Sequence, residues 1–237
     1  MCSHRLDSFA EGEALPGEER VAERAICPIC NKRRAERYCP AKGEKICAVD
    51  CGTEREVTID CPPDCSYLIA AHRWELAHPK PIPESEIPFP DVSVSSDQVR
   101  MRSATFWGLG YTILAYASEQ RLLTDAEVFD AVESIATTYR TLTSGIYYEN
   151  PPAAALAAGL YVTLAKLLQE EKKTEANQPG SSGLKDSEIF HLLVFFLRFA
   201  RLRSNGRPRS RAFLDFLRAE YPAKAETTTE ERRIILP

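Results

Sequence analysis

The sequence lacks the long apolar runs that a membrane-spanning helix needs. Its longest uninterrupted apolar run, Leu192 to Leu197, ends at Arg198 and is far shorter than the roughly 20 residues that cross a bilayer. The first residues also lack a basic start followed by an apolar core, so no signal peptide is visible. We therefore expect a cytoplasmic protein in a reducing compartment, without a membrane partner.

Signals for common catalytic machinery are also missing. The sequence has no glycine-rich phosphate loop, no nucleophile elbow and no paired cysteine and histidine with a supporting acid. Glu188-x2-His191 matches one element of the di-iron helix bundles, but the second copy that such a site requires is absent. The net charge of −4 gives no overall attraction to nucleic acid. The composition therefore disfavours an enzyme, and nucleic-acid binding would need a local basic patch.

Cysteine, in contrast, is concentrated in one short segment. Seven of the eight cysteines fall between Cys27 and Cys65, and the eighth, Cys2, lies in a predicted flexible arm over residues 1–20. In a reducing compartment, clustered cysteines are more typical of metal ligands than of disulfides. We expect Cys2 to be a free thiol and the other seven to bind metal.

The spacing of the seven cysteines favours a tetrahedral metal site. Close pairs place two sulfurs on one tight turn, and each pair fills half of a tetrahedral coordination sphere. A redox role for the first pair would need a strand-helix-strand context that is absent. The sequence therefore predicts one or two structural Zn²⁺ ions, held by Cys27, Cys30, Cys39, Cys47, Cys51, Cys61 and Cys65.

The segments Cys27-Pro28-Ile29-Cys30, Tyr38-Cys39-Pro40 and Ile46-Cys47 followed by Cys51 resemble the HIT-type and MYND-type zinc fingers over residues 27–65. In those families the ligand pairs interleave around two zinc ions. The resemblance implies that Cys27, Cys30, Cys47 and Cys51 share one ion, while Cys39, Cys61 and Cys65 share another. Lys42 stands where the partner of Cys39 is expected, and Cys61 stands where histidine is usual. The implied second site is thus one ligand short.

His72 is the leading candidate for the missing ligand. The segment from Asp64 to Trp74 is predicted to be helical, and His72 would lie two turns beyond Cys65. The alternative is a solvated surface histidine. A single four-cysteine site with spare thiols also stays open, as does a catalytic zinc at the incomplete second site.

Composition divides the chain into segments. Residues 21–78 hold few large apolar side chains and would need metal to fold, with a strand expected over Glu54 to Asp60. A proline-rich segment over residues 79–96 predicts an extended, semi-rigid linker. Residues 97–222 are predicted to be helical, and residues 223–237 to form a tail. The fold class is therefore mainly α, with a small cysteine-rich module that contains a short β-hairpin.

Capping signals predict about five helices in the helical segment. Ser95 with Gln98 and Thr124 with Glu127 read as capping boxes, the first opening a helix that runs to about Arg121. Further helices are expected after Pro151, from about Asp186 and around Phe213 to Leu217, the last ending before Pro222. The helix from Asp186 is apolar on nearly all sides, so we expect it to be central. Gly145 and the Asn205-Gly206 pair are expected to end helices.

One local patch is strongly basic. Six arginines without an intervening acid surround the end of the fourth predicted helix, namely Arg198, Arg201, Arg203, Arg207, Arg209 and Arg211. The plain interpretation is that they bind the exposed carbonyls at the helix end or remain solvated. The alternative is a site for phosphates or an acidic partner.

The best functional hypothesis from sequence is a non-enzymatic intracellular adaptor that docks a protein partner through its zinc module and helix faces. The alternative is a nucleic-acid-binding protein that uses the Arg198 to Arg211 patch and the basic finger surface. The third hypothesis is a zinc-dependent enzyme at the incomplete second site.

Overall fold

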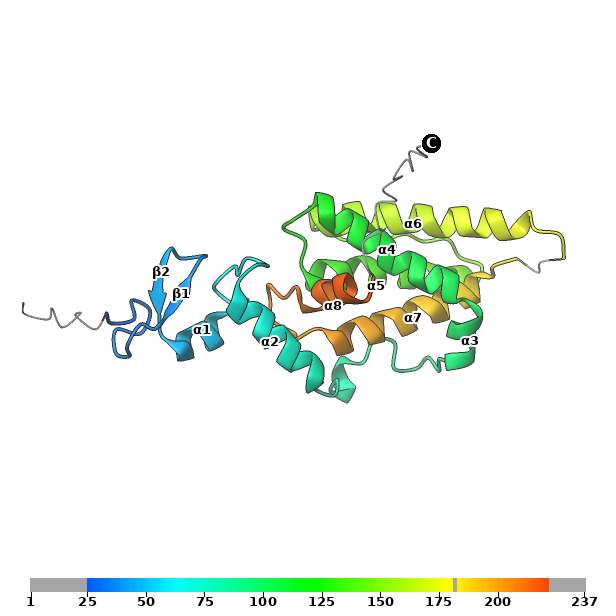
Figure 1. Ribbon diagram of the computed structural model, residues 1–237. Coiled ribbons are helices and arrows are strands. Elements are labelled where there is room, and N and C mark those ends of the chain that lie inside the picture. Colours follow the sequence, from blue (N-terminus) through cyan, green and yellow to red (C-terminus); the bar gives the residue numbers. More distant parts are fainter. Residues whose placement is uncertain (1–24, 181–182, 222–237) are drawn as a thin grey trace, which may run out of the picture.

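The computed structural model describes residues 25–180 and 183–221. The predicted arm, the predicted tail, Cys2 and Pro222 lie outside this part. The chain is mainly helical, with one two-stranded antiparallel hairpin and a cysteine cluster near the N-terminus, as the sequence predicts (Figure 1). Among the described helices, none has the length and apolar character needed to cross a membrane.

The cysteine-rich module, residues 25–77, comes first. Strands β1 (Arg37–Cys39) and β2 (Glu44–Ile46) form the hairpin, which turns at Gly43 with a φ of +69°. Helices α1 (Ala48–Glu54) and α2 (Ser66–Ala77) follow, and α2 covers most of the predicted helix. The buried core is small, because four of its eight residues are cysteines and its large apolar members are only Ile46, Ile59 and Leu68.

The strand predicted over Glu54 to Asp60 is wrong. Helix α1 continues through Glu54, whose carbonyl oxygen then accepts the N–H groups of three following residues in a tight turn. Glu56 has a φ of +55°, which a strand residue does not adopt. A single bridge between Arg55 and Ile59 is the only ladder contact in this turn. The alternation of polar and apolar residues over 54–60 therefore belongs to a tight turn, in which the polar residue Glu56 is buried.

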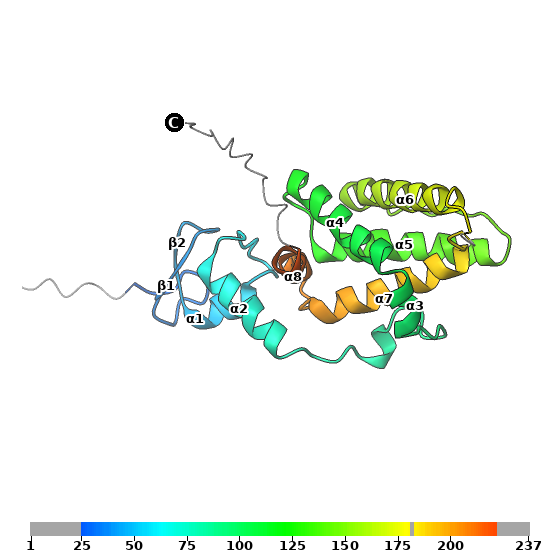
Figure 2. The ribbon, with the colours of Figure 1, turned by 45° about the vertical axis from the view of Figure 1, so that its right-hand side comes forward.

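Six helices form the bundle: α3 (Ser96–Met101), α4 (Ser103–Glu119), α5 (Asp125–Thr143), α6 (Ala155–Ala176), α7 (Asp186–Arg203) and α8 (Ala212–Glu220). Helix α7 packs against α3, α5 and α8, while α6 lies over α4 and α5 (Figure 1). Eight of the α7 residues are buried, which confirms the predicted central helix. Helix α8 lies between the module and the rest of the bundle (Figure 2).

The capping predictions are confirmed in part. Both capping boxes form, and Gly145 and Gly206 adopt φ values of +75° and +71° after α5 and α7. The first predicted helix is interrupted at Arg102, whose guanidinium group leaves the helix line to pair with Glu175 and Glu188, both at 2.8 Å. Helix α6 begins at Ala155 and not in the turn of Pro151.

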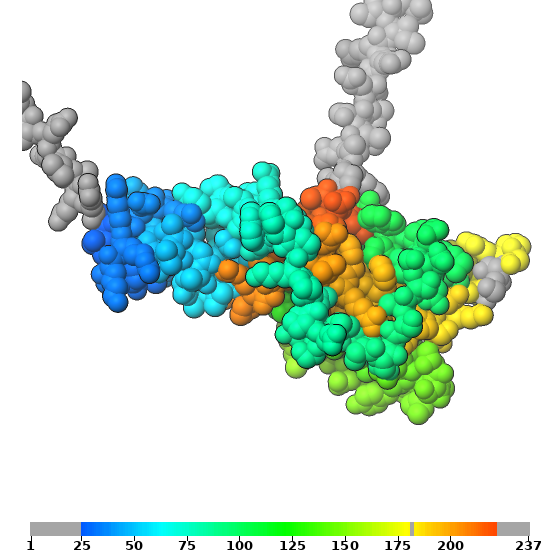
Figure 3. Space-filling view, turned by 90° about the horizontal axis from the view of Figure 1, so that it is seen from below, coloured from blue at the N-terminus to red at the C-terminus, as the bar shows by residue number. Residues whose placement is uncertain are grey.

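The proline-rich segment is not a free spacer, which corrects the sequence prediction. Residues 78–95 contain the short 3₁₀ helix η1 (Glu84–Glu86) and run along α7 (Figure 3). The Arg198 guanidinium group donates hydrogen bonds to the carbonyl oxygens of Pro88, Phe89 and Val92 at 3.0, 2.6 and 2.9 Å. The Phe89 ring packs edge-on against Phe190. The linker is therefore held on the bundle.

Candidate metal centre

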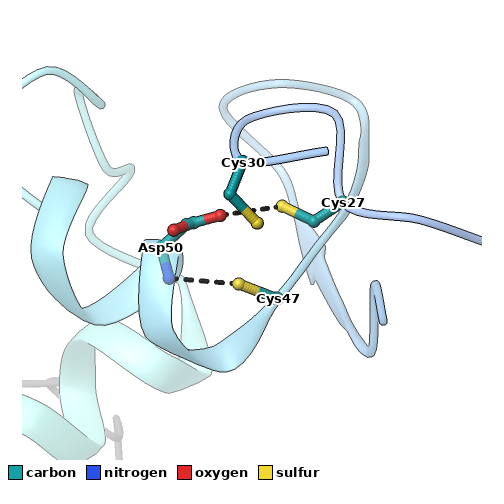
Figure 4. Close-up of side chains that lie close together, drawn as sticks. All are labelled: Cys27, Cys30, Cys47 and Asp50. Atoms are coloured by element: carbon teal, nitrogen blue, oxygen red, sulfur yellow. Dashed lines mark hydrogen bonds between the residues drawn. The ribbon is translucent and has the colours of Figure 1, made fainter. Parts of the chain in front are cut away.

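Four potential ligands converge at the base of the hairpin. The side-chain donor atoms of Cys27, Cys30, Cys47 and Asp50 all lie within 4.8 Å of one another (Figure 4). Cys27 and Cys30 belong to a turn that closes when the Asn31 N–H bonds the Cys27 carbonyl oxygen at 2.8 Å. Cys47 caps the N-terminus of α1, and Asp50 lies in the first turn of that helix. The hairpin and α1 thus bring the two halves of the site together.

Hydrogen bonds and charge keep this site anionic. The Cys27 thiol donates to Asp50 Oδ2 at 3.1 Å, and the Asp50 N–H donates to Cys47 Sγ at 3.3 Å. Hydrogen bonds with the side chains of Cys30, Cys27 and Cys47 lower the pKa of Asp50 to about 2. Arg33 Nη1 lies 3.5 Å from Asp50 Oδ1, and its positive charge offsets part of the negative charge of the carboxylate.

The donor set fits a metal ion. Three sulfurs and one carboxylate oxygen are all ligands that a tetrahedral ion accepts, and all four come from the protein. The finger resemblance implies Cys51 as the fourth member of this group, whereas the structure brings Asp50 close to the three cysteines. Carboxylates are accepted zinc ligands, so residue type alone could have admitted Asp50.

Cys51 lies instead with the remaining cysteines. Cys39, Cys51, Cys61 and Cys65 line one cavity of about 10 Å³, which has room for a single atom-sized guest. They come from β1, α1 and the two ends of the turn that leads into α2. Burial raises the pKa of the Cys61 thiol, and the nearby Cys65 and Cys39 raise it further. Among the described residues, Cys27, Cys30, Cys47 and Asp50 are the one group whose donor atoms lie close enough together to hold a metal ion.

His72 is neither a metal ligand in this arrangement nor a solvated histidine. Its Nε2 lies 3.0 Å from Glu56 Oε2 and its Nδ1 lies 2.9 Å from Asp215 Oδ2, so both ring nitrogens are taken by carboxylates. The residue is 3% exposed. Burial lowers the pKa of His72, but the bonds to Asp215 and Glu56 outweigh burial and raise it to about 9. His72 joins the module to α8.

Glu56 is the centre of this junction and was not predicted as a functional residue. The residue is 1% exposed, and beside His72 its carboxylate accepts Asn205 Nδ2 at 2.8 Å and the Arg211 N–H at 3.0 Å. The Glu56 carbonyl oxygen accepts the Arg209 N–H at 2.9 Å. The module and bundle are therefore joined through a buried polar network and not through an apolar face.

The six arginines are mostly used inside the chain. Arg201 pairs with Glu133 at 2.9 Å and Arg211 with Asp60 at 2.8 Å. Arg207 donates to the carbonyl oxygens of Gly52 and Arg55 at the end of α1. Arg198 donates to carbonyl oxygens of the linker. Four of the six arginines therefore bind other segments of the chain. The predicted basic patch therefore mostly binds other segments of the chain. Within the described residues, Arg203 and Arg209 are the two members whose side chains form neither an ion pair nor a hydrogen bond.

Comparison of the chain with models of protein families, with curated proteins and with solved structures returns no match. The resemblance to the HIT-type and MYND-type fingers thus stays a prediction. Function has to be argued from the geometry of the site and its surroundings.

Proposed function

We propose that the chain is a non-enzymatic adaptor whose N-terminal module is folded around structural zinc. One ion is held by Cys27, Cys30, Cys47 and Asp50, and a second by Cys39, Cys51, Cys61 and Cys65. Zinc is the ion of choice because a tetrahedral, sulfur-rich set suits zinc, and the spacing matches no ferredoxin pattern. The convergence of four donor atoms within 4.8 Å supports the first ion, and the cavity that Cys39, Cys51, Cys61 and Cys65 line together supports the second.

A structural role is favoured over a catalytic one. A catalytic zinc keeps a coordination position open for water, with three protein ligands. The first group offers four protein ligands, and Cys51 supplies the fourth residue that the second group lacked in the sequence interpretation. His72, the ligand on which the enzyme hypothesis depended, bonds Glu56 and Asp215 instead.

The surface of the module supports an interaction role. Several large apolar side chains are exposed on this small unit: Ile26, Tyr38, Val49, Val57, Tyr67, Ile69 and Trp74. Exposed apolar side chains of this kind are typical of surfaces that meet another protein. The nucleic-acid alternative depended on a free arginine patch, and four of those arginines bind within the chain.

Metal analysis of the purified full chain tests the zinc sites. We expect two zinc ions per chain, one fewer after Cys47→Ala and one fewer after Cys61→Ala. Cys2→Ala is the matched control, because Cys2 is not among the proposed ligands, and it should keep both ions. A wild-type chain without zinc, or a Cys61→Ala variant with the full content, would contradict the assignment.

The adaptor role is tested by comparing cross-linked partners in the native host. A Tyr38→Ser, Val49→Ser double variant should lose the partners that a Met101→Ser control on the bundle keeps. Met101 is 75% exposed, so its replacement removes a comparable apolar group without touching the module. An identical set of cross-links for both variants would argue against the module surface.

A further inference from the structure

A cavity of about 450 Å³ opens where the module, the linker and the bundle meet. Its walls come from α2, from the first linker residues and from the loop between α7 and α8. In the space-filling view this loop, in orange, lies directly beside the cyan residues of the module and linker (Figure 3). The volume falls in the range of about 300 to 1,000 Å³ that is usual for small-ligand pockets. The proposed zinc sites do not use it.

Cations outnumber acids among the charged side chains that line the cavity. Arg55, Lys80, Arg203 and Arg207 face one carboxylate, Glu75, and that carboxylate already pairs with Arg55 at 3.0 Å. Arg207 is partly occupied by carbonyl oxygens of α1. The positive charge that remains favours an anionic ligand.

Arg203 is held in place without an acceptor for its N–H groups. Its guanidinium carbon lies 4.9 Å from the centre of the Phe216 ring and 5.5 Å from that of Phe199, so two aromatic rings fix it. Its Nε is buried and has no hydrogen-bond partner in the described part of the chain. The Arg203 guanidinium group is thus fixed in position without a hydrogen-bond partner in the described part of the chain. Its planar geometry suits a bidentate contact with a phosphate.

An aromatic surface lies on the same cavity. The Trp74 indole lines the wall, is 59% exposed, and stacks on His78 with ring centres 4.4 Å apart. Half-exposed tryptophan rings stack well on nucleobases, because every base presents a π-face. The cavity therefore combines an aromatic surface, on which a planar ring can stack, with cationic side chains.

We propose that this cavity binds a nucleoside phosphate, with the base against Trp74 and the phosphate held by Arg203 and Lys80. The ligand is a free nucleotide or a terminal nucleotide of a single strand, since both carry the same groups. The proposal goes beyond the adaptor role and does not depend on it, because no proposed zinc ligand lines the cavity.

Tryptophan fluorescence of the full, zinc-loaded chain tests the proposal. The chain has two tryptophans, so a Trp107→Phe background leaves Trp74 as the only reporter. The probes are adenosine monophosphate, adenosine, inorganic phosphate and a short single-stranded oligoribonucleotide. We expect saturable quenching by the monophosphate or the oligonucleotide, weakened about tenfold or more by Arg203→Gln and less by Arg203→Lys.

Arg209→Gln is the matched control, because it removes the same charge from an exposed position in the same loop. Its affinity should stay within about twofold of the parent. Zinc content and thermal unfolding of each variant confirm that it folds. Binding by the oligonucleotide alone, with the same dependence on Arg203, assigns the site to a strand end. No quenching by either probe, quenching that Arg203→Gln leaves unchanged, or equal affinity for inorganic phosphate would overturn the proposal.

Discussion

The module and the bundle are held together by different means. The bundle buries a continuous apolar core in which Phe196 and Phe213 are fully covered. The buried core of the module has three large apolar side chains and otherwise cysteines and one alanine. A unit of that size cannot bury enough apolar surface to offset its loss of conformational entropy. The two regions therefore differ in how much apolar core each has, and the proposed metal ions would stabilise the region that has little.

The junction between the module and the bundle is held in a third way, by buried polar side chains. Its centre is the buried contact of Glu56 with His72, Asn205 and the backbone of Arg211, with Asp215 on the far side of the histidine. A polar network of this kind fixes one geometry, and it is sensitive to the loss of any single member. Substitutions in the bundle, at the junction and on the linker should therefore have different effects.

The largest expected effect of a single substitution is on the bundle core. Phe196→Ala removes a ring that packs against Phe106 and Phe213, and we expect it to cost about 3–5 kcal/mol of unfolding free energy. Zinc content should not change. Val162→Ala, at a 64% exposed position on α6, is the control and should stay within about 0.5 kcal/mol. Loss of zinc in Phe196→Ala would show that the two halves do not fold by separate means.

The next effect is at the junction. Glu56→Gln keeps the size of the side chain but places an N–H group either against His72 and Asn205 or against the Arg211 N–H, all of which are donors to Glu56. We expect a loss of roughly 3 kcal/mol in urea-induced unfolding, since a buried charged partner is removed. Glu54→Gln, two residues earlier and bonded only to Thr58 through its side chain, is the matched control. Equal stabilities of the two variants would contradict the role of Glu56.

The same junction should depend on pH. The pKa of His72 is raised from 6.5 to about 9 in the folded protein, so its stabilisation is complete below pH 6.5 and is lost as pH rises towards 9. We expect the unfolding free energy to fall by up to about 3 kcal/mol across this window, compared with His72→Gln. Unfolding curves at pH 6.5 and 9 measure the difference. A wild-type curve parallel to that of the variant would be inconsistent with a charged, paired His72.

The smallest effect concerns the linker. Arg198→Ala leaves the carbonyl oxygens of Pro88, Phe89 and Val92 without their donor, and we expect a loss of about 1–2 kcal/mol. Hydrogen exchange of residues 84–95 should accelerate while that of α7 stays slow. Arg100→Ala, at an exposed side chain, should leave exchange unchanged. Slow exchange in both variants would show that the linker is held by its apolar contacts alone.

Local signals predicted most of the helical fold. The Thr124 and Glu127 capping box, the positive φ at Gly206 and the apolar α7 depend on neighbours in sequence, and all three were predicted correctly. The break at Arg102 was not, because it depends on Glu175 and Glu188 from distant helices. The spacing of residues along the sequence does not show which residues of distant helices will form ion pairs.

Prediction of the metal-binding group from the sequence was limited in the same way. Cysteine spacing predicted that a metal-binding group would form, but it did not distinguish Asp50 from Cys51 as the fourth member, because adjacent residues of a helix point in different directions. His72 looked like a ligand because its partners, Glu56 and Asp215, are not visible from spacing. For the same reason, the sequence predicted arginines that bind helix-end carbonyls or solvent, and it did not indicate the ion pairs of Arg201 and Arg211.

We propose that bound metal folds the module, while the bundle folds without it. Amide NMR spectra of the full chain before and after a strong chelator, and again after two equivalents of zinc, test it most directly. We predict that the signals of residues 25–77 collapse and return, while those of α4 to α7 persist throughout. An unchanged spectrum in a chain shown to be free of metal would contradict the account.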